Sequence, residues 1–233
     1  MSKSVKIGIV AMFVVLIIFV AILTICCWLY NAVTDISNAD KLNTTASTTI
    51  YKPMVTSVVL GQPQEITDDD INGIIAKIIN SSLMNEAKQS NSVVAVKGAS
   101  LYTQGGNTAK LYVDLQYKQY RIIFSADTKI QLDTDYKIIT IYLSNTKLGS
   151  LTVPVGFVTG KIAKSLTEIN SSIQVYKDSI VIPSEYNIEF LDKNVTLYIA
   201  DLQLNQGNAT IQTNSAMDVI SQFIDEIIEG IFN

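Results

Sequence analysis

Hydrophobic and polar positions along the chain follow three different spacings, and each spacing predicts a different kind of element. The first is an unbroken apolar run from Ile7 to Leu29 that contains no charged residue. As a helix this run would be about 34 Å long, and the hydrocarbon core of a bilayer is about 30 Å thick. We therefore predict a transmembrane anchor over residues 7–29.

The charged residues beside this run predict its orientation in the membrane. Lys3 and Lys6 precede the run, whereas Asp35 and Asp40 follow it. Because basic flanks are retained on the cytoplasmic side, residues 1–6 are expected to be a cytoplasmic tail and the rest of the chain to lie outside the cell membrane. A removable signal peptide is the alternative. Its apolar region is usually only about 7 to 15 residues long, so we favour an uncleaved single-pass anchor.

The second spacing is helical and begins after Thr67. Thr67 can cap a helix N-terminus, and the three aspartates at 68–70 place negative charge where the helix dipole favours it. The isoleucines that follow recur every three or four residues, at Ile71, Ile74, Ile75, Ile78 and Ile79. This pattern predicts an amphipathic helix with one apolar stripe. A calcium loop would need acidic residues at alternate positions, a glycine and a distant glutamate, so helix capping is the favoured role of the aspartates.

Two further helices are predicted later in the chain. One begins after Pro154 and covers residues 155–169. The other closes the chain with an apolar stripe made of Ile220, Phe223, Ile224, Ile227, Ile228 and Ile231. The polar face of this last helix is acidic, whereas membrane-surface helices are usually basic, so we expect it to pack against a sheet.

The third spacing is strict alternation, which predicts β-strands from Val93 to Leu148 and a further strand pair over residues 188–211. The segments Gln104–Asn107 and Asp133–Asp135 contain residues that tolerate turn conformations, so they are expected to be hairpin turns in an antiparallel sheet. The expected fold class is α+β: a single N-terminal transmembrane helix followed by a curved antiparallel sheet packed against amphipathic helices.

Composition divides the part of the chain that follows the anchor into a polar stalk and a folded domain. Residues 30–63 are rich in Asn, Thr and Ser, and we predict a polar stalk there, with a short strand at Val55–Leu60. Residues 64–233 are then one extracytoplasmic α+β domain, which is long enough to bury a core. Both cysteines, Cys26 and Cys27, fall inside the predicted anchor, so this domain is expected to have no disulfide and no cysteine-bound metal.

Charge and residue types narrow the possible chemistry. A net charge of −4 argues against a nucleic-acid partner, which would require a basic surface. The absence of histidine removes Ser-His and Cys-His catalysis. Ser144–Lys147 matches the Ser-x-x-Lys pattern of penicillin-interacting enzymes, but it falls at a predicted strand end and its partner motifs are missing. Asp133 and Asp135 could serve a glycosidase in principle, yet aspartates are common in hairpin turns. We expect no enzyme and no cofactor.

Three stretches of the chain carry a likeness to a known family: the segment LGSLTVP at Leu148–Pro154, the helix start at Ile66–Asn72, and Ile182–Pro183 with the residues over 194–204. Together they resemble the YpmS-like family of membrane-anchored envelope proteins of Gram-positive bacteria. The first resembles the "iGkLplP" segment of that family, the second its helix start and the third its closing strands. The likeness covers most of residues 64–212. It implies a single-pass envelope protein and supplies no catalytic residue.

Two non-enzymatic functions fit these expectations. A curved sheet facing an isoleucine-rich helix would leave an apolar groove, and concave sites of that kind bind small ligands. The ligand would be a lipid or another apolar envelope molecule, and the candidate lining residues are Ile71, Ile74, Ile75, Ile78, Val153 and Phe157. The alternative is a structural or partner-binding component of membrane or cell-wall machinery, which needs only an exposed patch. In both cases the lipid bilayer is the expected partner of residues 7–29, and an envelope protein is a possible further partner.

Overall fold

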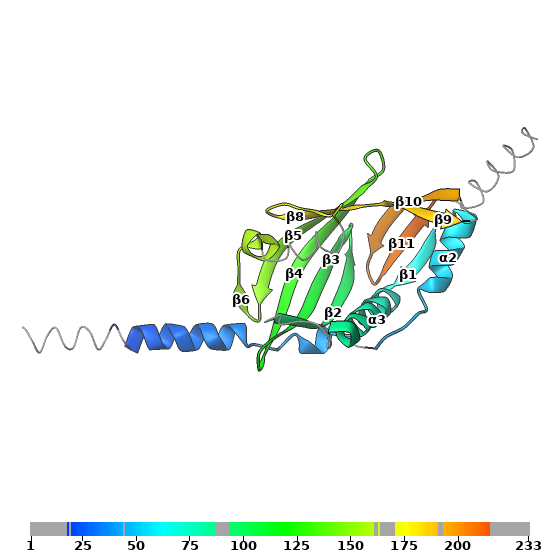
Figure 1. Ribbon diagram of the computed structural model, residues 1–233. Coiled ribbons are helices and arrows are strands. Elements are labelled where there is room, and N and C mark those ends of the chain that lie inside the picture. Colours follow the sequence, from blue (N-terminus) through cyan, green and yellow to red (C-terminus); the bar gives the residue numbers. More distant parts are fainter. Residues whose placement is uncertain are drawn as a thin grey trace, which may run out of the picture.

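The computed structural model combines helices with two antiparallel sheets, and a helix at the N-terminal side extends away from them (Figure 1). It describes residues 18, 20–43, 45–86, 94–160, 163, 171–190 and 193–214. The mixed α and β composition and the large antiparallel sheet confirm that part of the predicted fold class. The predicted C-terminal helix stripe, residues 220–231, lies outside the described residues.

The predicted anchor is described only in part. Residues 20–33 form one helix, whereas residues 1–17 lie outside the described part. The side chains of Ile18, Trp28 and Tyr30 are more than half exposed. Within the described residues, none of the helices combines the length and apolar character needed to cross a membrane. The transmembrane span over residues 7–29 therefore stays a prediction.

The larger sheet contains seven antiparallel strands in the order β2-β3-β4-β5-β8-β7, with β6 paired to β5. Its strands are β2 (Val94–Gly105), β3 (Thr108–Tyr117), β4 (Tyr120–Asp133), β5 (Ile138–Leu148), β6 (Leu151–Thr152), β7 (Gln174–Val175) and β8 (Ser179–Pro183). Tight turns join β2 to β3 at residues 106–107 and β4 to β5 at residues 134–137, near the predicted positions. Asn107 and Lys137 lie in these turns with φ values of 60° and 54°.

The smaller sheet contains four strands in the order β1-β11-β10-β9. These are β1 (Gln64–Thr67), β9 (Glu185–Phe190), β10 (Lys193–Asn205) and β11 (Asn208–Thr213). One extended segment links the two sheets, because β8 pairs with β5 up to Pro183 and β9 then pairs with β10 from Glu185. An isolated β-bridge between Gln104 and Gln206 is one of the links between the sheets at their other end.

The helix α3 (Asp68–Glu86) packs along β2, and its start confirms the predicted capping. Thr67 Oγ1 accepts a hydrogen bond from the Asp70 N–H at 3.2 Å, and the Asp70 carboxylate accepts one from the Thr67 N–H. The fully buried Asn72 side chain donates to the Leu101 carbonyl and accepts from the Leu101 N–H. Asn72 therefore satisfies backbone groups of β2 and fixes the helix to that strand.

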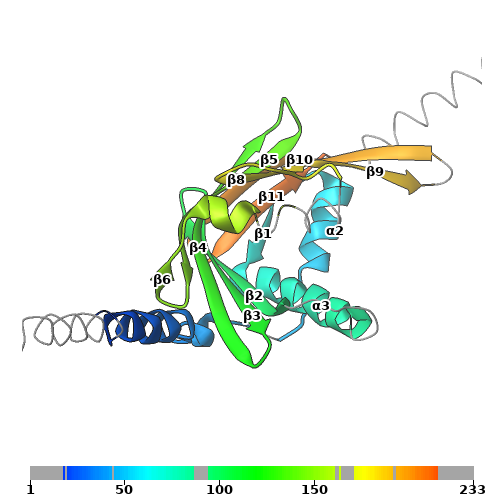
Figure 2. The same ribbon diagram turned by 60° about the vertical axis from the view of Figure 1, so that its left-hand side comes forward.

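The predicted polar stalk, residues 30–63, contacts both sheets and contains two short helices. The 3₁₀ helix η1 (Ala39–Lys41) lies near the large sheet, and α2 (Tyr51–Leu60) lies beside β1 and β11 (Figure 2). The predicted strand at Val55–Leu60 was wrong. Gly61 ends a helix there in the left-handed conformation, and the buried Ser57 hydroxyl accepts a hydrogen bond from the Thr213 N–H.

Alternation divides the large sheet into an apolar face and a polar face. On the apolar face, Phe124, Ala126 and Leu143 form a buried cluster with half-buried neighbours from β3. The helix at residues 155–160 covers this cluster through Val155 and Val158. Of the predicted helix at 155–169, residues 161–162 and 164–169 lie outside the described part.

The end of the N-terminal helix and the residues after it are attached to the polar face, and residues 30–43 and 45–47 are called the docked segment below. The buried Ala32 offers its carbonyl to the Ser150 N–H at 2.8 Å, and the Asn43 N–H donates to Ser100 Oγ at 2.8 Å. The Tyr102 hydroxyl donates to the Lys41 carbonyl at 2.7 Å. These contacts are hydrogen bonds to backbone groups of the segment, spread along most of its length.

Candidate functional site

The structure does not gather the six predicted groove residues at one place. Ile71 packs against a buried cluster of Ala109, Leu204 and Ala209. Ile74 and Ile75 are half-buried on the same helix, α3, and Ile78 is 57% exposed. Val153 and Phe157 follow β6, on the β5 side of the large sheet, whereas α3 lies on β2. β3 and β4 lie between these positions, and none of the six residues lines either of the two cavities described below.

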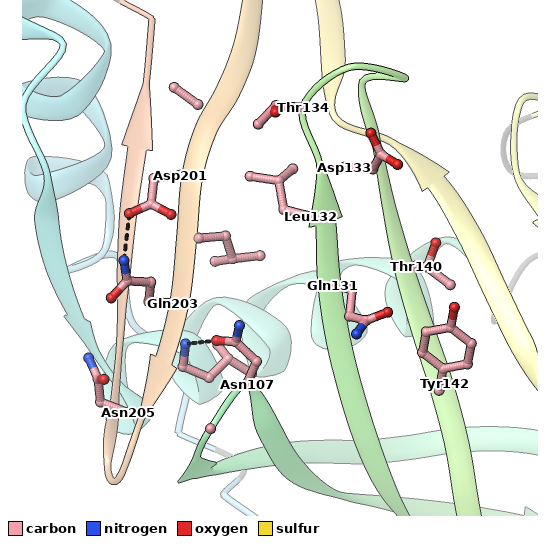
Figure 3. A pocket seen from close by; sticks show the side chains of 14 residues that line it. Asn107, Gln131, Leu132, Asp133, Thr134, Thr140, Tyr142, Asp201, Gln203 and Asn205 are labelled. Carbon is pink, nitrogen blue, oxygen red and sulfur yellow. Dashed lines mark hydrogen bonds between the residues drawn. The ribbon is translucent and has the colours of Figure 1, made fainter.

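A cleft lies between the β4–β5 hairpin and β10 (Figure 3). Its volume is about 830 Å³, within the range of about 300 to 1,000 Å³ that small-molecule sites occupy. The lining residues come from the β2–β3 turn, the β4–β5 hairpin and β10: Gly106, Asn107, Gln131, Leu132, Asp133, Thr134, Thr140, Tyr142 and residues 200–205.

One end of the cleft is closed by Asn107, which contacts both sheets. Its carbonyl accepts a hydrogen bond from the Ile130 N–H at 2.8 Å, and its side-chain oxygen accepts one from the Leu204 N–H at 2.8 Å. Asparagine tolerates the left-handed backbone conformation that this turn requires. A single turn residue therefore holds β4 and β10 together at this end.

The other end of the cleft is closed where β8 passes into β9. The Ser184 N–H donates to the Lys137 carbonyl at 2.8 Å, and the Ile199 N–H donates to the Ser184 carbonyl at 2.9 Å. The Lys137 ammonium lies 3.3 Å from the ring centroid of Tyr198, a cation–π contact that adds to this attachment. The cleft is thus bounded by two fixed attachments between the sheets.

Between these attachments, one edge of β10 faces the cleft without a partner strand. The pairing of β9 with β10 ends at Tyr198, and β11 pairs with the opposite edge of β10. Among the described strands, none pairs with the cleft edge over residues 200–203. Backbone N–H and C=O groups are strong hydrogen-bonding groups, so this edge offers them to a ligand.

Polar side chains border the cleft on both sides. Figure 3 shows Asp201, Gln203 and Asn205 along β10, and Gln131, Asp133, Thr140 and Tyr142 along the hairpin. The Asp201 carboxylate accepts a hydrogen bond from the Gln203 amide at 2.9 Å. Leu132 lies between the two sides, and Leu202 and Leu204 contribute to the underlying apolar cluster. The lining therefore combines polar side chains from the hairpin and β10 with leucines, and Leu132 projects into the space between the two strands.

The charges of the lining restrict the ligand. Asp133 and Asp201 carry negative charge, and the lining contains no lysine or arginine. An anionic ligand would be repelled by both carboxylates. The Tyr142 ring is 41% exposed and offers an aromatic surface beside the hydroxyl and amide groups. The arrangement suits a neutral ligand with many hydroxyl groups.

The candidate catalytic motifs from the sequence lie in a strand and in a hairpin turn of the structure. Ser144–Lys147 lies within β5, where Ser144 Oγ donates to the Asp127 carbonyl at 3.4 Å, so it lacks the helix start that the Ser-x-x-Lys motif requires. Asp133 Oδ1 accepts hydrogen bonds from the Asp135 and Tyr136 N–H groups in the hairpin turn. In the described part of the chain, no three acidic or cysteine side chains are grouped as metal ligands would be.

No family model, curated protein or solved structure matches the chain. The resemblance to YpmS-like proteins stays a prediction, and the candidate site is defined by the geometry of the cleft.

The sequence did not reveal the cleft, because its two sides are distant in the chain. Residues 131–142 and residues 200–205 belong to different sheets. The alternation of Leu202 and Leu204 with polar residues does predict a strand with one buried face. It does not indicate which element lies opposite the polar face, and that information comes only from the fold.

Proposed function

We propose that this chain is a membrane-anchored, extracytoplasmic, non-catalytic binding protein whose cleft takes a neutral, hydroxyl-rich ligand such as a saccharide. The observation that carries the proposal is the cleft of about 830 Å³ whose lining combines polar side chains from the hairpin and β10 with leucines. A hydroxyl group both donates and accepts hydrogen bonds, so it can pair with the carboxylates, amides and hydroxyls that border the cleft.

The polar lining favours this ligand class over an apolar one in the same cleft. Gln131, Gln203 and Asn205 each carry two amide donors and an acceptor, and the bond from Gln203 to Asp201 uses only one of them. A lipid chain packed against such amide groups would separate polar atoms from water without offering them a partner, at a cost of about 1 to 3 kcal/mol for each buried group. The Tyr142 ring and Leu132, which also line the cleft, can contact the apolar faces of sugar rings.

The anchor and its orientation are supported by the apolar run and its basic N-terminal flank. The docked segment would then hold the sheets next to the outer surface of the membrane. Ligands in that position belong to the cell envelope, which is rich in saccharide polymers in Gram-positive bacteria, the group to which the family resemblance points.

A lipid or other apolar ligand remains the second candidate, and one observation favours it. Leu111, Val113, Leu115 and Ile141 on the apolar face are only partly buried. An acyl chain on this face would bury further apolar surface, which stabilises a complex by about 25 cal/mol for each Å². A structural or partner-binding role is the third possibility and requires no cavity.

The test is calorimetric titration of neutral oligosaccharides into the full chain in detergent micelles. We expect saturable binding that Tyr142→Ala weakens about tenfold, which corresponds to about 1.4 kcal/mol. Tyr136→Ala is the matched control, because Tyr136 is 78% exposed in the same hairpin and does not line the cleft. Its affinity should equal that of the parent chain.

Two results would overturn the saccharide proposal. The first is an equal loss of affinity in Tyr142→Ala and Tyr136→Ala, which would separate binding from the cleft. The second is an absence of saccharide binding together with a stoichiometric lipid in the protein purified from its own membranes, which would favour the apolar face as the site. Cleavage of the oligosaccharide during the titration would contradict the non-catalytic role.

A further inference from the structure

A second cavity lies on the polar face of the large sheet, beside the docked segment. Its volume is about 330 Å³. The sheet supplies most of the lining and the docked segment supplies one residue: Lys110, Tyr112, Ser125, Asp127, Asn145, Lys147, Thr152 and Asn38. Since a water molecule has a share of about 30 Å³ in the liquid, the space is on the order of ten water molecules.

Strand register places four of these residues in one row across four strands. Tyr112 on β3 lies opposite Ser125 on β4, Ser125 lies opposite Lys147 on β5, and Lys147 lies opposite Thr152 on β6. Residues directly opposite each other in an antiparallel pair have Cβ atoms about 4.5 to 5.5 Å apart and share a face. The row therefore presents three hydroxyl groups and one ammonium group to the same cavity.

A neighbouring row contains the acidic residue of the site and its partners. Lys110 lies opposite Asp127, and their charged groups are 3.5 Å apart. The Asn145 amide donates to the other oxygen of Asp127 at 2.7 Å. Both carboxylate oxygens thus have a partner within the protein.

A β-bulge between β4 and β5 produces this arrangement. The register shifts between Ser125 and Asp127, and Asn145 on the opposite strand has a φ of 49°. Bulges redirect side chains, and non-glycine residues with positive φ are concentrated at functional sites. Here the bulge directs the Asn145 amide onto Asp127. Asp127 is on β4, between the strands that carry Lys110 and Lys147.

The charge balance of the cavity differs from that of the chain. Two lysines and one aspartate give the lining a formal charge of +1, whereas the whole chain carries −4. Lys110 is paired with Asp127, and Lys147 forms no ion pair with any residue that the structure describes. The cavity therefore offers one uncompensated ammonium group, three hydroxyls and the Asn38 amide.

We propose that this cavity binds a phosphoryl group. A phosphoryl oxyanion accepts hydrogen bonds only, and the lining offers mainly donors on a positively charged site. Lys147 neutralises part of its charge, and the hydroxyls of Ser125 and Thr152 on the adjacent strands donate to its oxygens. The volume admits the phosphoryl group with a short polar substituent, and the polar lining disfavours an acyl chain. This site is separate from the saccharide cleft and does not depend on it.

The probe is inorganic phosphate, titrated into the full chain in a phosphate-free detergent and chloride buffer, with binding followed by calorimetry and by the thermal unfolding midpoint. We expect saturable binding that Lys147→Gln weakens at least about tenfold. Thr152→Val should weaken it to a smaller extent, because it removes one neutral donor and keeps the charge. The binding should also weaken with increasing salt.

The matched control is Lys129→Gln, which removes the same charge from an exposed position on the same face that does not line the cavity. Its phosphate affinity should equal that of the parent chain, and both lysine variants should keep the parent unfolding midpoint without phosphate. An absence of saturable phosphate binding to the parent chain would overturn the proposal. Equal losses in Lys147→Gln and Lys129→Gln would overturn it too, because general charge would then explain the binding.

A second titration distinguishes the two sources of a phosphoryl group. Glycerol 3-phosphate carries the phosphoryl group and the polar backbone of a phospholipid but no acyl chain. Tighter binding of glycerol 3-phosphate than of inorganic phosphate, with the same dependence on Lys147, assigns the site to a lipid headgroup at the membrane surface. Tighter binding of inorganic phosphate assigns it to the free ion.

Discussion

The two faces of the large sheet are built from alternate residues of the same strands, yet each is covered by a different kind of contact with the rest of the chain. The apolar face buries Phe124, Ala126 and Leu143 beneath a helix. The polar face is attached to the docked segment through single hydrogen bonds, such as those at Ser150 and Ser100. The apolar face supplies stability, whereas the polar face supplies positions for specific contacts and the wall of the second cavity.

The largest expected effect comes from placing a charge on the apolar face. Ala126 is 1% exposed, so Ala126→Asp buries a carboxylate without a partner. The cost is at least several kcal/mol, comparable to the total stability of a domain, and we expect the cooperative thermal transition to disappear. Lys129→Asp, at an exposed position of β4, is the control and should unfold like the parent chain. A retained transition in Ala126→Asp would show that this cluster is not the core.

The polar face can be tested by separating the docked segment from it. Gly149 has a φ of 59°, and an added Cβ would lie 2.2 Å from the Ala32 carbonyl oxygen and 2.7 Å from that of Val33. Gly149→Ala should release the segment while the sheets stay folded, because the apolar cluster is unchanged. Limited proteolysis within residues 34–47 should become faster, with little change in the unfolding midpoint. Gly106→Ala, in a turn with open space around it, carries similar backbone strain and should leave proteolysis unchanged.

The edge of the sheet should respond with an intermediate effect. Asn72→Ala removes both hydrogen bonds to Leu101 and leaves backbone groups of β2 without partners. We expect a loss of about 2 to 4 kcal/mol in the free energy of unfolding, measured by urea denaturation. Asn80→Ala, at an exposed position of the same helix, should cost much less. Equal costs in the two variants would contradict the role of Asn72 in fixing α3 to β2.

The smallest effect concerns pH and the start of α3. Hydrogen bonds from the hydroxyls of Thr49 and Thr67 lower the pKa of Asp70 from its usual value of 3.8. Because the folded pKa lies below the unfolded one, the contribution to stability is complete above the unfolded value. It is lost as the pH falls through the folded value. Asp70→Asn should therefore lower the unfolding midpoint slightly at neutral pH and by less at acidic pH. If the unfolding midpoints of Asp70→Asn and the parent chain differed by the same amount at every pH, the predicted titration of Asp70 would be contradicted.

Sequence alternation predicted the apolar face well, because each strand carries its own pattern of buried residues. Leu111, Val113 and Leu115 mark it without reference to any other segment. Capping at Thr67 was predictable for the same reason. Attachments through backbone groups leave no such pattern in the sequence, because the hydrogen bonds of Ala32 and Lys41 use carbonyls that any residue possesses. That is why residues 30–47 were predicted to be part of a stalk, and why the cleft between distant strands was not predicted.

The attachment of the docked segment to the sheet has a consequence for how the protein meets its ligands. A flexible linker of about thirty residues would let the sheets sample distances on the order of 30 Å. The bonds at Ser150, Ser100 and Tyr102 remove that freedom and give the sheets a fixed orientation relative to the helix at residues 20–33. For a chain held in a bilayer by residues 7–29, both cavities would then stay at constant heights above the lipid surface. The distance between each cavity and a molecule bound at the membrane surface would be fixed by the fold. With a flexible linker, that distance would vary, and the effective concentration of the molecule at the cavity would be an average over it.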